Sequence, residues 1–300
     1  MKKFLLVLGG AAENEAAIAR LISLAEAGTV AELLTIVHEP SLDGYLGNTE
    51  IYAPLRQRLI DEAAAKAAQF EESVKSKGIN VTSKTIWDWS RGDAIRREAE
   101  SFGADVIVMT FGFDAHRHIG ARDWRFLAEC PVPILVVNSD GKVPYSKIMA
   151  AVDPVHAHAK PSELDAQIVA TAANVNRRAG GKLGLVHCFL PLSRYGAHAG
   201  EIGRVPLNDA EQALEKSRQA ALAQLAQGAG LDAAADIRLI EGDSVDSLEQ
   251  LAEDGEADLI VLGALARGKL ASLIIGSTAE RLLHRVVCDL LLVKPAVAES

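Results

Sequence analysis

The chain has 300 residues, enough for about two domains that each bury a core. Its formal net charge of −9 argues against nucleic acid as a main partner, because nucleic-acid binding needs a basic surface. The three cysteines are an odd number and lie far apart, which disfavours a disulfide framework and favours a reducing compartment. No apolar run approaches the length of a membrane span, so no membrane partner is expected.

The N-terminus, MKKFLLVLGGAA, has the lysines, apolar stretch and small residues of a secretion signal. A similar lysine-led apolar string, KIMAAVD from Lys147 to Asp153, occurs in the middle of the chain, where a signal peptide cannot act. Both strings are therefore interpreted as the first strands of a repeated domain. On this argument the protein is expected in the cytoplasm.

The two halves of the chain share one order of elements. Each has a lysine-led strand, a helix, a second strand, a long helix and a third strand, followed by a shorter helix. The fourth strands are nearly identical, ADVIVM from Ala104 and ADLIVL from Ala257. The order β-α-β-α-β-α-β-α-β predicts an α/β fold with a doubly wound, five-stranded parallel sheet in each half. Domains are expected at residues 1–140 and 145–300, joined by the linker-like string SDGKVPYS.

Several single residues are matched between the halves by this repeat. His38 and His187 are expected to end the two second strands, each with a structural hydrogen bond. The pairs Gly92-Asp93 and Gly242-Asp243 are expected to lead into the shorter helices. Cys130 and Cys288 precede the last strands and are expected to occupy equivalent packed positions.

The second half contains a strand, a glycine-bounded loop and a helix start that together are typical of an anion site. An apolar strand from Leu259 ends at Gly263, and a second glycine, Gly276, precedes Ser277. Ser277 and Glu280 form the S-x-x-E pattern of a capping box, which predicts that a helix starts there. Such a start leaves backbone N–H groups and the positive end of the helix dipole available to an anion, typically phosphate.

Two phosphate-loop patterns compete for these residues. The string GALARGK from Gly263 to Lys269 fits seven positions of a Walker A loop, but Leu270 stands where the magnesium-binding hydroxyl is needed. The other spacing is Gly263-x2-Ala266-x9-Gly276-Ser277. It resembles the G-x2-G-x9-G-[ST] nucleotide loop of the universal stress protein family, with Ala266 where the family usually has its second glycine.

The resemblance to this family extends over the whole chain, and the strings GSTAERLLHRVVCDLLLVKP and DWRFLAECPVPILVV are similar to its two-domain bacterial subgroup. It implies a module for stress survival that binds an adenine nucleotide (ATP, ADP or AMP), with room for Mg²⁺. It also implies a tandem chain that mimics a dimer internally, with the fifth strands paired across a pseudo-two-fold axis, and a homodimer as a further option. The site residues that it implies are Asp153, Cys188, Gly263, Ala266, Gly276, Ser277 and Thr278.

The first half departs from these positions. Gly9 stands where Asp153 ends the first strand, and Glu39 is expected to replace the pocket-lining residue Cys188. The loop from Gly112 to Gly120 is shorter than its counterpart. Nucleotide binding is therefore expected in the second half alone.

Other functions receive less support from the sequence. His116 and His118, two residues apart on a loop, are weak zinc candidates without a visible third ligand, so no metal site is assigned. No arrangement of nucleophile, base and orienting group stands out. The alternatives that stay open are a slow ATPase or other ATP-using enzyme on a similar fold, and an interaction scaffold without ligand, which Ala266 favours.

Overall fold

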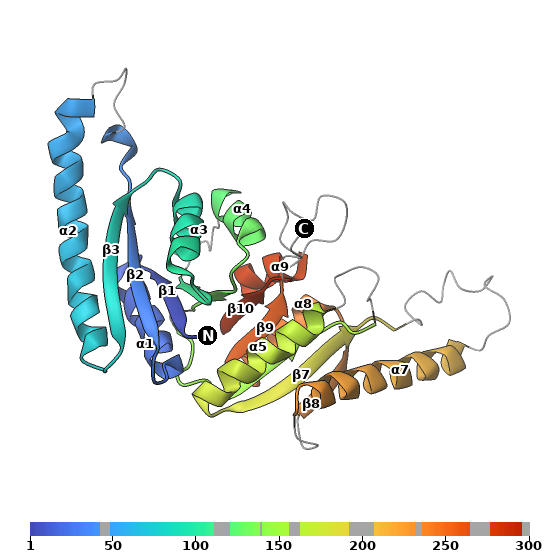
Figure 1. Ribbon diagram of the computed structural model, residues 1–300. Helices are drawn as coiled ribbons and strands as arrows, with labels where there is room; N and C mark the ends of the chain where they lie inside the picture. Colours follow the sequence, from blue (N-terminus) through green and yellow to red (C-terminus); the bar gives the residue numbers. More distant parts are fainter. Residues whose placement is uncertain are drawn as a thin grey trace. The chain divides into compact units, whose positions relative to one another are not determined.

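The computed structural model describes residues 1–42, 49–110, 121–138, 140–155, 163–191, 207–231, 236–264 and 277–295. The described residues divide into two compact units, with the boundary between Val143 and Pro144. Each unit is an α/β unit built on a parallel sheet (Figure 1). The predicted fold class, two tandem doubly wound sheets, is confirmed.

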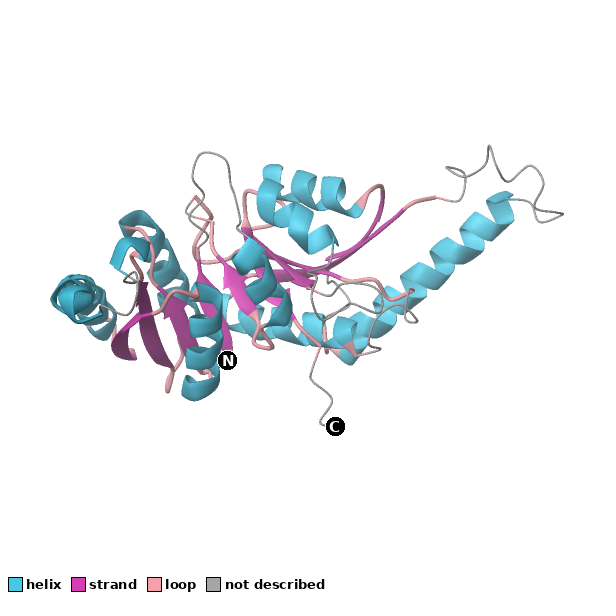
Figure 2. Ribbon diagram, turned by 90° about the horizontal axis from the view of Figure 1, so that it is seen from above, coloured by secondary structure: helices cyan, strands magenta, loops and turns pink. Residues whose placement is uncertain are grey.

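The first unit has the strand order β3-β2-β1-β4-β5, and its neighbouring strands are parallel. The chain moves outward from β1 in one direction and then crosses back to the other side. Because parallel crossovers are almost always right-handed, crossovers in both directions place helices on both faces of the sheet, as Figure 2 shows. Its elements are β1 (Lys3–Val7), α1 (Ala11–Leu24), β2 (Val30–Val37), the short 3-10 helix η1 (Pro40–Leu42), α2 (Thr49–Lys75), β3 (Asn80–Trp87), α3 (Arg91–Phe102), β4 (Val106–Met109), α4 (Ala121–Glu129) and β5 (Ile134–Val136).

The second unit repeats this topology with the order β10-β9-β6-β7-β8. Helix α5 packs on β6 and β9 and touches α7, whereas α8 packs on β7 and touches α9. The two helix pairs therefore form two separate layers. The elements are β6 (Lys147–Ala151), α5 (Leu164–Ala179), β7 (Lys182–Phe189), α7 (Leu207–Gly228), β8 (Asp236–Glu241), α8 (Ser244–Glu253), β9 (Leu259–Gly263), α9 (Ser277–Arg285) and β10 (Asp289–Val293).

Strands β4 and β10 are buried along their whole length. All four residues of β4 and all five of β10 are buried, which is the pattern of parallel strands covered by helices on both faces. Helices α3 and α5 both end at a glycine in the left-handed region, Gly103 at φ 69° and Gly180 at φ 70°, where a side chain would be strained. Among the described residues, no helix combines the length and the apolar character that a bilayer crossing requires.

An aspartate precedes each fourth strand, Asp105 before β4 and Asp258 before β9, and its contacts explain why the Ala-Asp sequence recurs in both halves. In the second unit the Oδ2 atom of buried Asp258 accepts hydrogen bonds from the backbone N–H of Ser146 (2.8 Å) and of Lys147 (2.9 Å), and from the Ser146 hydroxyl (2.6 Å). In the first unit Asp105 accepts from the backbone N–H groups at the start of β1. The repeated aspartate ties the start of the first strand to the fourth and so has a structural role.

The strand register corrects the predicted match between the two histidines. Val7, the last residue of β1, lies opposite Leu34, and Ala151, the last residue of β6, lies opposite Val186. Thr35 and His187 come directly after Leu34 and Val186. His187 therefore corresponds to Thr35, and its match with His38 is wrong. His38 instead lies beyond β2, with its ring edge-on to Trp87 at 5.7 Å between centroids.

The predicted equivalence of Cys130 and Cys288 is also wrong. Ile134 and Leu290 occupy the same position in their sheets, since each lies opposite the second residue of the neighbouring fourth strand. Cys130 lies four residues before Ile134, whereas Cys288 lies two residues before Leu290. Both cysteines are buried, so their common feature is packing in the core.

Candidate functional site

Asp153 follows β6 at the carboxyl edge of the second sheet, the edge at which open α/β sheets bind ligands. Its backbone N–H donates to the Oδ1 atom of Asp165, a buried carboxylate near the start of α5, at 3.2 Å. Its own Oδ1 lies 3.7 Å from Nδ1 of His187. The side chain of Asp153 is 27% exposed, so a fixed carboxylate faces solvent at this edge.

His187 is a buried residue of β7 that supports this carboxylate. Its Nδ1 atom lies 3.0 Å from the carbonyl oxygen of Val152, which confirms the predicted structural hydrogen bond. Because a carbonyl oxygen only accepts, Nδ1 carries the proton and also directs positive charge density toward Asp153. Sequence analysis missed this second contact, although the alternation of side chains along β7 could have placed His187 on the α5 side of the sheet.

The first unit fills the corresponding space with its own carboxylate. The N–H of Gly9 donates to Oδ1 of Asn14 at 2.7 Å, as the N–H of Asp153 does to its partner on α5. A Cβ atom on Gly9 would lie only 2.7 Å from Oε2 of Glu13, which also accepts a hydrogen bond from the N–H of Gly10 at 2.9 Å. Glu13 thus occupies the volume that a side chain at position 9 would need. This is a physical reason for an asymmetry between the units.

Gly263 ends β9, beside β6, and its need for glycine comes from packing. A Cβ atom there would lie 2.9 Å from Cδ2 of Leu164 and 3.3 Å from Cδ1 of Ile168, both on α5. A larger residue here would require the ends of these two side chains to shift, so the packing of α5 favours glycine. Packing is therefore a reason for this glycine that does not depend on a ligand.

The N-termini of α8 and α9 meet at the same edge. The hydroxyls of Ser244 and Thr278 lie 3.4 Å apart. The carboxylate of Asp243 caps α8 by accepting from the N–H of Val245 at 3.0 Å. Helix α9 begins at Ser277 itself, so this serine is the first helical residue and does not hold the N-cap position that the predicted capping box gives it. Ala266 and Gly276 lie outside the described residues.

Cys188 lies on the other side of β7 from His187 and contacts α8. Its pKa is raised to about 11, mainly by burial and against a hydrogen bond with Ser247, so the thiol is neutral at physiological pH. The strand register aligns Cys188 with Ile36, and Glu39, which was expected at the equivalent position, lies beyond β2. The first unit therefore keeps an apolar residue at this position.

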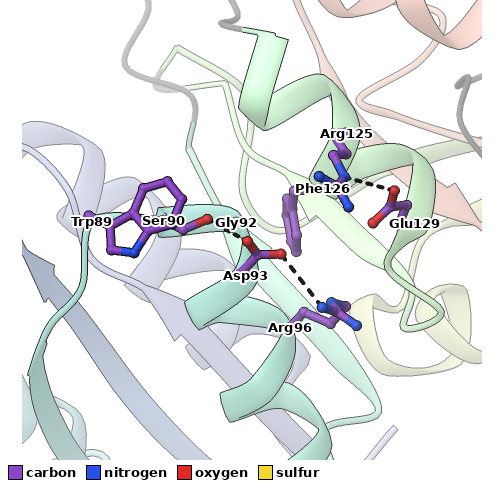
Figure 3. Close-up of a pocket in the computed structure, with 8 residues that line it drawn as sticks. All are labelled: Trp89, Ser90, Gly92, Asp93, Arg96, Arg125, Phe126 and Glu129. Carbon is purple, nitrogen blue, oxygen red and sulfur yellow. Dashed lines mark hydrogen bonds and ion pairs between the residues drawn. The ribbon is translucent and has the colours of Figure 1, made fainter.

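A pocket of about 100 Å³ lies in the first unit between α3 and α4 (Figure 3). Asp93 accepts a hydrogen bond from the Ser90 hydroxyl at 2.6 Å and pairs with Arg96 at 3.5 Å. The hydrogen bond from Ser90 is the largest cause of the lowered pKa of Asp93, with Arg96 also contributing. Two arginines of the lining balance the charges of its two carboxylates, so the pocket has no net charge. The lining residues are Trp89, Ser90, Gly92, Asp93, Arg96, Arg125, Phe126 and Glu129.

Sequence analysis missed this pocket because it treated Gly92-Asp93 only as a repeat landmark. That match is wrong: the N-cap of α3 is Ser90, which places Gly92-Asp93 inside the helix, whereas Asp243 is itself the N-cap of α8. The signal that could have found the pocket is Trp89, a large aromatic side chain that is 61% exposed directly before a helix start.

The zinc candidates His116 and His118 lie outside the described residues. Within the ranges that are described, no group of three His, Cys, Asp or Glu side chains is placed to hold a metal ion.

Comparison with known proteins places the chain in a family. The Universal stress protein family model matches residues 1–138 and 144–294, so the chain belongs to the universal stress protein family. It is 25% identical to the Universal stress protein E homolog of Haemophilus influenzae, with 98% of each chain covered. It is 24% identical to Universal stress protein E of Escherichia coli K12, over 80% of this chain and 77% of the relative.

Solved structures show the same fold along the whole chain. A putative universal stress protein from Pseudomonas aeruginosa UCBPP-PA14 aligns with a TM-score of 0.71 and 19% identity, covering 99% of this chain and 94% of the other. A universal stress protein from Archaeoglobus fulgidus DSM 4304 aligns with a TM-score of 0.65 and 16% identity, covering 98% of each chain.

Proposed function

We propose that the second unit of this universal stress protein binds an adenine nucleotide at the carboxyl edge of its sheet. The observation that carries the proposal is the partly exposed carboxylate of Asp153, held beside His187 at the end of β6. A fixed carboxylate at this edge can accept hydrogen bonds from ribose hydroxyls. The α9 helix start, with the hydroxyls of Ser277 and Thr278, offers N–H and O–H donors to phosphate.

The proposed role is ligand sensing in a stress response. In the described part of the site the thiol of Cys188 is neutral and half-buried, and the proton of His187 is committed to a backbone carbonyl. The basic nitrogen of His187, Nε2, is buried, so neither group is placed to act on a ligand as a nucleophile or base, which favours binding over turnover. Mg²⁺ would enter with the phosphates of the nucleotide. A cytoplasmic location belongs to the same proposal and is supported by three free cysteines.

Replacing Ser277 with alanine should weaken ATP binding about 2- to 10-fold, because one hydrogen bond to a phosphate oxygen is lost. The measurement is calorimetric titration of ATP into the full-length protein. Ser101→Ala, at an exposed position near the end of α3, is the control and should leave the affinity unchanged. Equal ATP affinity for the wild type and Ser277→Ala would show that the helix start of α9 does not bind the nucleotide.

A further inference from the structure

Arg218 is a buried cation that the proposed nucleotide site does not use. It lies on α7, is only 9% exposed, and shares the buried stripe of that helix with Leu222 and Ala226. The spacing of four residues places all three on the side that packs against α5, β7 and β8 (Figure 1). Arginine is rarely buried without a partner, because its charge loses the hydration that water provides.

The partner that the structure shows for Arg218 is an aromatic ring. Its guanidinium carbon lies 4.2 Å from the ring centroid of Phe189, the last residue of β7. Stacking on a ring uses the face of the guanidinium and leaves its five N–H donors in the plane around the edge. The Nη1 atom is fully buried and has no hydrogen-bond acceptor within the described residues.

Within the described ranges no carboxylate oxygen pairs with the Arg218 guanidinium within 4 Å. Glu215 and Glu211 precede Arg218 by about one and two turns on α7, and Glu241, the end of β8, lies opposite Phe189 in the sheet. No ion pair within 4 Å joins Glu241 to Arg218, whereas other arginines of this unit, such as Arg238, do pair with carboxylates. A buried donor without an acceptor is destabilising, so an acceptor supplied from outside would stabilise the fold.

We propose that Arg218 is the anchor of an oxyanion-binding site on the α7 side of the second unit. The planar fork of the guanidinium fits two oxygen atoms of a carboxylate or a phosphate, while Phe189 holds the plane in place. The site goes beyond the proposed nucleotide function, because Arg218 is not among the residues proposed to hold the nucleotide. The phosphate donors at Ser277 belong to the α8–α9 layer, whereas α7 belongs to the α5 layer. Phe189 and His187 share one side of β7, so Asp153→Ala is the variant that distinguishes the two sites.

Thermal unfolding of the full-length protein in sodium phosphate, sodium acetate and sodium chloride of equal ionic strength tests this site. An anion that binds only the folded state raises the Tm. We expect the wild-type Tm to be higher in phosphate or in acetate than in chloride. Because phosphate also stabilises proteins in general, the oxyanion is identified by the arm whose rise is lost in Arg218→Met. In Arg218→Met, which keeps the volume and removes the charge, the dissociation constant from the concentration dependence should increase about tenfold or more.

Three further variants make the result decisive. Arg218→Lys keeps the charge but loses the fork, so it should fold and show a reduced anion response. Arg58→Met, an exposed arginine of α2, should keep the full response. Asp153→Ala should also keep it, which separates this site from the nucleotide site even if ATP does not bind.

The proposal is overturned if the wild-type Tm is the same in all three salts, or if Arg218→Met retains the anion response. It is also overturned if Arg218→Met and Glu241→Gln both lower the Tm in chloride by the same amount, because Glu241 would then be the partner of Arg218 in solution.

Discussion

Replacing Asp153 with alanine should weaken ATP binding to the full-length protein by about 10- to 100-fold, the largest effect on binding that we expect. The carboxylate would accept hydrogen bonds from the ribose, and a hydrogen bond to a charged group contributes about 1.5–3 kcal/mol. Because Asp153 is partly exposed and lies outside β6, the substitution should leave the fold intact. Calorimetric titration measures the change.

The matched control for Asp153 is Glu13→Gln in the first unit. Glu13 is the carboxylate that fills the equivalent volume beside Gly9, so this change also removes a negative charge at a strand end. Since the first unit is not expected to bind nucleotide, the ATP affinity of Glu13→Gln should match that of the wild type. Equal losses in both variants would show a general effect of charge and contradict the assignment to the second unit.

Replacing Asp258 with alanine should lower the free energy of unfolding by about 2–4 kcal/mol, the largest effect on stability that we expect. The change removes three hydrogen bonds to one buried carboxylate oxygen, and two of their donors are backbone N–H groups at the start of β6. Urea denaturation of the full-length protein gives the difference.

Asp105→Ala is the matched control, because Asp105 has the same position in the repeat and also binds the start of the first strand. Asp105 is exposed, however, and its partners can bond to water when it is removed. Its loss should therefore cost clearly less. If the two variants were equally stable, burial of the aspartate would not be the source of the effect.

The sequence was sufficient to predict the succession of elements and the parallel sheets, because the apolar strands and the Asp105 and Asp258 motifs recur in both halves. It was not sufficient to align single residues. His38 and His187 are the same residue type near the end of a strand. The equivalent positions are set by how the first and second strands of each unit pair, and that pairing aligns His187 with Thr35. A register set by contacts between strands is not visible in a linear comparison.

The candidate site shows the same limit. Asp153 was implied by the resemblance to the family, and the structure puts it at the carboxyl edge of the second sheet. The packing of Leu164 against Gly263, and the carboxylate of Glu13 beside Gly9, are contacts between segments that local patterns do not connect. From the sequence, Gly9 and Gly263 were both interpreted in terms of the nucleotide site. In the structure, a Cβ atom at either position would come too close to a neighbouring side chain.

The measurement that tests the central claim most directly is the number of ATP molecules bound per chain, taken from calorimetric titration of the full-length wild-type protein. One nucleotide per chain is predicted, because Asp153 faces solvent at the second sheet while Glu13 fills the corresponding space in the first. Two nucleotides per chain would show that the first unit binds as well. No binding of ATP, ADP or AMP would show that the edge of the second sheet is not a nucleotide site.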